Sequence, residues 1–306
     1  MSGRLSGGMS MQHAAALIRS GKLVAFPTET VYGLGANALD AAAVERIFAA
    51  KGRPHTSPLI VHVDSVEMAR AFAAHWPGAA EILARHYWPG PLTLVVPKRV
   101  APKHAAIPDI VTAGLPTVAL RVPAHPLALE LIRTAGLPIA APSANRFTEL
   151  SPTAAGHVPE RLADFVLDGG PARVGIESTV LSLVEAPTLL RPGTIPLTEI
   201  EALIGPVQVA ATAGPGPHAS PGMHARHYRP DTPLLLLNSG DPVPHGRGAH
   251  LRIGHEMPAA PLAYAAALYE TLHRLDAQHL EWIAVERPPD TPEWAGILDR
   301  LRRAAS

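Results

Sequence analysis

Lys51 and Arg53 place two cations two residues apart, where a predicted helix ends. A compact ammonium beside a planar guanidinium suits a polyphosphate better than a single carboxylate, because one is a point charge and the other a fork of donors. The alternative is a solvated helix terminus, since the helix dipole also favours lysine near a C-terminus. The pair indicates phosphate chemistry only if other polar motifs converge on it.

Two further polar residues lie on predicted apolar strands. Arg121 lies in the run TVALRVP (117–123), so we expect its guanidinium at the sheet edge, where it can bind a carboxylate or form a structural salt bridge. His62 alternates with apolar residues in PLIVHV (58–63), where a histidine is more often a core residue than a catalyst. Both interpretations stay open for each residue.

Covalent and metal-dependent chemistry have little support in the sequence. Ser143 and Ser178 lack the G-x-S-x-G turn of a hydrolase nucleophile, so hydrogen-bonding roles are favoured. His218, His224 and His227 lie in a proline-rich stretch with no carboxylate, which disfavours a metal site. The chain has no Cys, which excludes thiolate zinc sites and Cys nucleophiles.

The run GLGANA (33–38) matches a dinucleotide-binding pattern, but the preceding strand is too distant and no acidic residue follows at the required spacing. Its glycines are better explained by a tight backbone path between a strand and a helix. No Walker A loop is present.

Strands and helices alternate along the first two thirds of the chain, which predicts an α/β domain with a twisted, mixed, open sheet and flanking helices. The predicted helices cover 10–20, 41–51, 65–74, 78–87 and 125–135. The predicted strands cover 22–26, 58–63, 91–97, 117–123, 137–143, 164–170, 178–184 and 188–193. Polar motifs stand at the ends of several strands, where open α/β sheets bind ligands, so we expect them to share one cleft.

Composition sets the domain boundaries. Residues 1–204 are predicted to form the catalytic domain, and residues 205–232 a linker rich in Pro, Gly and His that lies over the active site. Residues 233–306 carry PLLLLN, a helical stretch near 260–278, WIAVE and a terminal helix from Pro292, which predicts a small α/β unit of Rossmann-like type.

The overall charge narrows the possible partners. The 306 residues carry 26 basic and 26 acidic side chains, so net charge gives no reason to expect a polyanion partner. With 47% apolar residues the chain can bury a sizeable core. No run is long enough to span a bilayer and no signal-peptide pattern opens the chain, so we expect a cytoplasmic protein without membrane contact.

Taken together, the motifs resemble the YrdC-like threonylcarbamoyl-adenylate synthase family in its longer two-domain form. The resemblance rests on FPTETVYGLG, KGRP-x3-PLIVHV, WPGPLTLV, TVALRVP, APSAN, SPT, DGGP-x3-GIESTV, LRPGTI and PGMHARHYRP. It implies that the threonine amine captures bicarbonate or CO2 and that the resulting carbamate attacks the α-phosphate of ATP. Magnesium would enter with ATP, with no protein-bound metal and no other cofactor, and a tRNA-modifying transferase would use the product.

The resemblance also implies roles for individual residues. Catalysis would depend on Lys51 and Arg53. L-Threonine would be bound by Thr30, His62, Arg121, Ala141 and Ser178. ATP would be bound by Lys51, Arg53, Ser57, Thr117, Ser143, Ser151, Arg191 and Tyr228. Tyr228 would close the site from the linker, and Ser57 stands where the family often has Asn.

Two alternatives remain at this stage. The first is a non-catalytic module that binds double-stranded RNA or tRNA, against which the zero net charge counts. The second is a carbamoyltransferase that makes a different carbamoyl-adenylate. Such proteins carry large additional domains, and those that act in hydrogenase maturation also have Cys-rich zinc modules that a chain without Cys cannot supply.

Overall fold

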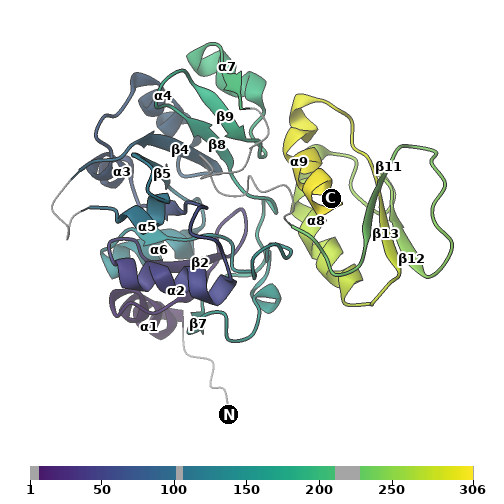
Figure 1. Ribbon diagram of the computed structural model, residues 1–306, viewed down its shortest axis with the longest axis horizontal. Helices are drawn as coiled ribbons and strands as arrows, with labels where there is room; N and C mark the ends of the chain where they lie inside the picture. The colour runs from purple at the N-terminus through teal and green to yellow at the C-terminus, as the bar shows by residue number, and fades with distance from the viewer. Residues whose placement is uncertain (1–6, 101–105, 211–227, 306) are drawn as a thin grey trace.

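The computed structural model describes residues 7–100, 106–210 and 228–305. These residues form a large mixed sheet with flanking helices and a separate three-stranded sheet, as Figure 1 shows. The predicted α/β class and mixed open sheet are therefore confirmed. Within the described residues, no helix is both long enough and apolar enough to cross a bilayer.

The large sheet has the strand order β10-β9-β8-β4-β5-β3-β6-β2-β1-β7. Its strands are β1 (Val24–Phe26), β2 (Gly33–Asn37), β3 (Ile60–His62), β4 (Leu92–Pro97), β5 (Thr117–Arg121), β6 (Ile139–Ala140), β7 (Phe165–Val166), β8 (Thr179–Ser182), β9 (Thr188–Arg191) and β10 (Gln208–Val209). The central pair β3 and β5 is parallel and aligns His62 with Arg121. The two polar residues predicted on apolar strands are therefore neighbours.

Helices cover both faces of this sheet. They are α1 (Gly7–Arg19), α2 (Ala41–Lys51), α3 (Val66–Phe72), α4 (Gly78–Tyr87), α5 (Asp109–Thr112), α6 (Pro126–Ala135) and α7 (Leu197–Ile204), with a short 3-10 turn at Ala155–His157. Strand β1 shows the two faces, because Ala25 packs into the cluster that contains α2 while Val24 and Phe26 pack with α1 and α6. The alternation follows from the period of a strand.

Helix α2 has the ends that its sequence predicts. The Asp40 side chain accepts hydrogen bonds from the backbone N–H groups of Ala42 and Ala43, which caps the first turn. Gly52 ends the helix in the left-handed conformation with φ of 64°. Because the stop is fixed there, Lys51 is the last helical residue and its side chain points inward.

Strand β2 corrects the interpretation of GLGANA. The run is not a connection between a strand and a helix but an antiparallel partner of both β1 and β6 inside the sheet. A Cβ atom on Gly35 would lie 2.8 Å from side-chain atoms of Phe26 and Ile139, so glycine is needed for packing space and not for a special turn. The two-residue alternation of a strand cannot be recognised here, because four of the six residues are glycine or alanine.

The smaller sheet has the order β11-β13-β12 and is parallel throughout. It contains β11 (Leu234–Leu237), β12 (Gly248–Leu251) and β13 (Trp282–Glu286), with helices α8 (Pro261–Asp276) and α9 (Ala295–Ala304) and a 3-10 turn at Pro292–Trp294. Figure 1 shows α8 and α9 between this sheet and the larger domain. The C-terminal α/β unit is thus present, and its two helices face the larger domain.

The predicted division at residues 204 and 232 stays a prediction. The large sheet continues to β10, past residue 204, and most of the predicted linker lies outside the described residues. The same holds for His218, His224 and His227, the histidines considered as metal ligands. Tyr228 is the first described residue after that stretch.

Candidate active site

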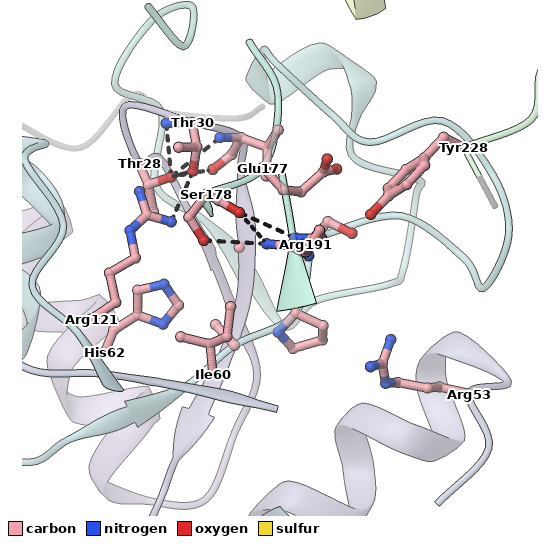
Figure 2. A pocket seen from close by; sticks show the side chains of 15 residues that line it. Thr28, Thr30, Arg53, Ile60, His62, Arg121, Glu177, Ser178, Arg191 and Tyr228 are labelled. Atoms are coloured by element: carbon pink, nitrogen blue, oxygen red, sulfur yellow. Dashed lines mark hydrogen bonds between the residues drawn. The ribbon is translucent and has the colours of Figure 1, made fainter. Parts of the chain in front are cut away.

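A polar pocket lies where the ends of several central strands meet loops of the larger domain. Its walls are Thr28, Thr30, Val31, Gly33, Arg53, Ile60, His62, Arg121, Ala141, Pro142, Ser143, Glu177, Ser178, Arg191 and Tyr228. Figure 2 shows Arg121 and His62 on one side, Arg53 and Tyr228 on the other, and Arg191 between them. The motifs expected to share one cleft do so.

Arg121 is held by a buried network at one end of the pocket. Its Nη2 donates to Glu29 Oε1 at 2.7 Å, its Nη1 to Thr30 Oγ1 at 3.0 Å, and its Nε to the carbonyl of Gly90 at 3.2 Å. Glu29 also accepts from the backbone N–H of Ala124 at 2.9 Å. A substrate carboxylate at Arg121 would therefore meet a guanidinium that is oriented and partly neutralised in advance.

His62 lies beside Arg121 and is 3% exposed. Burial, and then the positive charge of Arg121, lower the pKa of this imidazole to about 3. Its Nδ1 atom has no hydrogen-bond partner among the described residues. The Nδ1 atom of this neutral ring can donate or accept one hydrogen bond with a ligand, depending on the tautomer. So low a pKa makes the ring a weak general base.

Arg53 supplies a cation at the opposite end of the pocket. Its Nη2 donates to the carbonyl of Pro58 at 3.0 Å and also to Ser57 Oγ, and its Nε donates to the Ser57 carbonyl at 3.3 Å. Burial lowers the pKa of Arg53 to about 10, which leaves it protonated at neutral pH. Ser57 itself is buried behind Arg53 and orients it.

Arg191, at the end of β9, lies in the middle of the pocket wall. Its Nε and Nη2 donate to the carbonyl of Ser178 at 3.1 and 2.9 Å, and Nη2 also reaches Ser178 Oγ at 3.2 Å. The Ser178 hydroxyl lies 2.8 Å from Thr93 Oγ1. The serine is therefore a hydrogen-bonding residue, with no histidine among these partners.

Four residues expected to bind ATP lie outside the pocket wall. Lys51 donates to the carbonyls of Ser143 and Asn145, so it fixes the loop after β6. Ser57 and Ser151 contact the pocket residues Arg53 and Glu177. Thr117 starts β5, and the two-residue period of a strand places it on the same face as Arg121, four positions away.

Burial lowers the pKa of the Lys51 ammonium well below its usual value, and the charge of Arg53 adds to the effect. The two backbone carbonyls offset part of this cost. The Lys51 side chain is therefore not solvated at the helix end, and it does not line the pocket. Lys51 connects α2 to the loop that carries Ser143 through buried hydrogen bonds.

The pocket wall and the residues that contact it include functional candidates that the sequence left unassigned. Glu29 and Glu177 lie inside the motifs PTET and GIEST, and each is buried and bound to an arginine. In the sequence, the signal that could have identified both residues is a single carboxylate within a motif rich in Ser and Thr. Arg300 of α9 has a different signal in the sequence. It lies on the same buried face of the helix as the apolar residues Ile297, Leu301 and Ala304.

Metal ligands are sparse in the part of the chain that the structure describes. There, no group of three or more His, Asp or Glu side chains is placed to hold an ion. Glu177 is the carboxylate of the pocket wall, and its oxygens already accept from Ser151, Tyr269 and Arg300.

Two family models match the chain in succession. One, described as "Telomere recombination", covers residues 16–193, and one described as "Threonylcarbamoyl-AMP synthase, C-terminal domain" covers residues 195–306. The chain belongs to the Sua5/YrdC family. Its two matches in sequence order make it a two-domain member.

Several curated relatives are named threonylcarbamoyl-AMP synthase, among them proteins of Bacillus subtilis and Pyrococcus abyssi. The Bacillus subtilis protein is 43% identical over 322 residues, covering 95% of this chain and 92% of that protein. The Pyrococcus abyssi protein is 52% identical over 231 residues, covering 73% of this chain and 66% of that protein. The second match thus spans just under two thirds of its relative.

Solved structures agree with the sequence matches. P. abyssi Sua5 complexed with L-threonine has a TM-score of 0.89 and 38% identity, covering 99% of this chain and 96% of that one. A nucleotide-bound HypF structure has a TM-score of 0.52 at 24% identity and is covered over only 30% of its length. The second likeness shows the fold alone.

Proposed function

We propose that this protein is a threonylcarbamoyl-AMP synthase that consumes L-threonine, bicarbonate and ATP. The observation that carries the proposal is a pocket with the buried guanidinium of Arg121 on one side, Arg53 on the other and Arg191 between them. Its similarity to Sua5 in complex with L-threonine, over nearly the whole chain, supports the same assignment.

The chemistry can be written as two balanced steps. The neutral threonine amine adds to bicarbonate with loss of water, forming a carbamate. A carbamate oxygen then attacks the α-phosphorus of ATP, and the bond to the β-phosphate breaks to release pyrophosphate. Because carbamates lose CO2 readily, positioning and exclusion of water are the main catalytic contributions.

At the threonine end, Arg121 would bind the carboxylate while Thr30 and His62 would complete the contacts. Thr30 Oγ1 already accepts from Arg121 and lies 2.8 Å from Thr28 Oγ1, so a substrate enters a set of oriented hydroxyls. His62 Nδ1 remains available for one polar group of the amino acid. Ala141 and Ser178 would form the adjoining wall.

At the nucleotide end, Arg53 and Arg191 would offset charge on the phosphates as it shifts to the departing pyrophosphate. Ser143 and Tyr228 also line the pocket. Lys51, Ser57 and Ser151 would act through the residues that they hold. Thr117 would meet the nucleotide farther along the sheet, next to the apolar cluster of Ile60, Val95, Ala119 and Val180.

Magnesium would accompany ATP and add positive charge at the phosphates. The product is a mixed anhydride with AMP as its leaving group. A transferase that acts on an adenosine of tRNA would consume it. The cytoplasmic location, a weak affinity for double-stranded RNA or tRNA, and the downstream transferase stay predictions, as does the role of bicarbonate.

The proposal is tested by pyrophosphate release from the purified protein with ATP, magnesium and bicarbonate. We expect release that depends on L-threonine and falls sharply when L-serine replaces it. No release with threonine, together with RNA binding that weakens steeply with salt, would instead support the non-catalytic module.

A further inference from the structure

Arg300 connects the C-terminal unit to the pocket. Although it belongs to α9, it is 1% exposed, and its guanidinium crosses into the larger domain. Its Nε donates to Glu177 Oε2 at 2.6 Å, its Nη2 to the Glu177 carbonyl at 3.2 Å, and its Nη1 to the carbonyl of Pro192 at 3.0 Å. One side chain therefore anchors both segments that flank Ser178 and Arg191.

Glu177, the main partner of Arg300, forms part of the pocket wall. It also accepts from Ser151 Oγ at 2.5 Å and from the Tyr269 hydroxyl of α8 at 3.3 Å. Two helices of the C-terminal unit thus contact one carboxylate of the pocket.

Arg300 also contacts a second wall residue. Its guanidinium carbon lies 5.3 Å from the ring centroid of Tyr228, within the range of a cation–π interaction. Tyr228 is 1% exposed and has a φ of 65°, a conformation that a bulky residue adopts only when its surroundings hold it. The ring of Tyr269, at a centroid distance of 5.9 Å, packs on it as well.

Two glycines bring the C-terminal unit this close. A Cβ on Gly175, two residues before Glu177, would lie 2.3 Å from the carbonyl oxygen of Ala265 in α8. A Cβ on Gly296 of α9 would lie 2.3 Å from the carbonyl oxygen of Gly193. The backbones on the two sides are therefore in direct contact, and Arg300 is seated by that contact.

The charges explain what Arg300 contributes. A bare carboxylate in this wall would repel a triphosphate and compete for Arg191. Asp299 also accepts from Arg300, at 2.7 Å, but Asp299 is bound by Arg303 at 2.8 Å, which leaves Arg300 to balance Glu177. Burial alone would raise the pKa of Glu177, yet Arg300 and then Arg191 hold that pKa below its usual value.

We infer that Arg300 is a positioning residue for the nucleotide end of the pocket, and that through it ATP binding depends on the docked C-terminal unit. By balancing Glu177 it leaves Arg53 and Arg191 to face the phosphates, and by packing on Tyr228 it shapes the adjoining wall. The inference rests on the proposed function and extends it to a part of the chain outside the larger domain.

The test is a cycle of variants in the full chain: Arg300→Met, Glu177→Gln and the double variant. Arg302→Met is the matched control, because Arg302 lies on the same helix with its side chain 51% exposed. Binding of a non-hydrolysable ATP analogue with magnesium, and separately of L-threonine, would be measured by calorimetry, with thermal unfolding as the check on folding.

We expect Arg300→Met to weaken the ATP analogue by about 5- to 150-fold, as for typical coupling between two sites. Threonine binding should weaken much less, because the partners of Arg121, which are Gly90, Thr30 and Glu29, include no partner of Arg300. The double variant should recover much of the loss, since removing the charge of Glu177 removes the repulsion. A purely structural ion pair would shift thermal unfolding and regain it in the double variant, but would leave the ATP affinity of the folded single variant equal to that of the control.

Nucleotide affinity of Arg300→Met equal to that of the control, or a double variant as weak as the single one, would overturn the inference. If Arg300→Met does not fold, Arg300→Lys keeps the charge without the fork and should bind with intermediate affinity; unchanged affinity would count against us. These outcomes differ from failure of the proposed function, in which the unaltered protein would release no pyrophosphate with threonine.

Discussion

Replacing Arg121 by alanine should damage both stability and threonine binding, for separable reasons. Arg121 and Glu29 are 3% and 5% exposed and 2.7 Å apart, so the substitution leaves a buried carboxylate without its cation. Breaking a buried pair in this way costs about 3–5 kcal/mol of unfolding free energy. In a chain of this size that lowers the melting temperature by roughly 6–20 °C.

Threonine binding should weaken by about 2–5 kcal/mol if its carboxylate pairs with Arg121 away from water. The double variant Arg121→Ala/Glu29→Gln separates the two effects. Because it leaves no buried charge, most of the stability should return, while threonine binding should stay weak.

Three measurements check this prediction: urea unfolding, calorimetric titration with L-threonine, and pyrophosphate release over a range of threonine concentrations. The expected pattern for the double variant is a near-normal unfolding midpoint with a greatly raised threonine requirement. Normal threonine affinity in a folded variant would refute the placement of the carboxylate at Arg121.

Other perturbations test different parts of the account. Lys51→Met should lower the unfolding free energy by about 1.5–3 kcal/mol, because it removes a charged donor from two buried carbonyls. It should also slow turnover. An unchanged urea midpoint would contradict a stabilising role of these hydrogen bonds. Gly35→Ala should cost about 1–3 kcal/mol through overpacking, whereas the control Gly156→Ala, whose Cβ meets nothing within 4 Å, should be neutral in the same assay. Since burial and Arg121 lower the pKa of His62 from 6.5 to about 3, the contribution of its neutral ring is present above about pH 6.5 and is lost as pH falls toward about 3. Urea midpoints across that range should therefore depend less on pH in His62→Gln, and identical pH profiles would contradict this.

Much of the larger domain can be predicted from local signals. Asp40 and Gly52 fix the two ends of α2, and apolar runs locate most strands of the sheet. The shared cleft is predictable too, because its polar motifs follow strand ends in an open α/β sheet. These features depend on a few neighbouring residues, so a single sequence carries them.

Features that depend on distant partners are not predictable in this way. Gly35 lies in β2 because Phe26 and Ile139 leave no room for a side chain, and neither constraint is visible in GLGANA. Lys51 points inward because its ammonium donates hydrogen bonds to backbone carbonyls that lie 92 and 94 residues later in the chain.

Arg300 is an intermediate case. Its position on the buried face of α9 follows from the helical period, but its partner Glu177 lies 123 residues earlier in the chain. The sequence can therefore identify an unusual arginine, but not the pocket that it reaches.

The most direct test of the central claim is to isolate the product formed from L-threonine, ATP and isotope-labelled bicarbonate. We predict a threonylcarbamoyl-AMP that carries the label, detected by mass spectrometry together with an equal amount of pyrophosphate. Pyrophosphate or AMP without labelled adenylate, under conditions in which an authentic sample survives, would contradict the account.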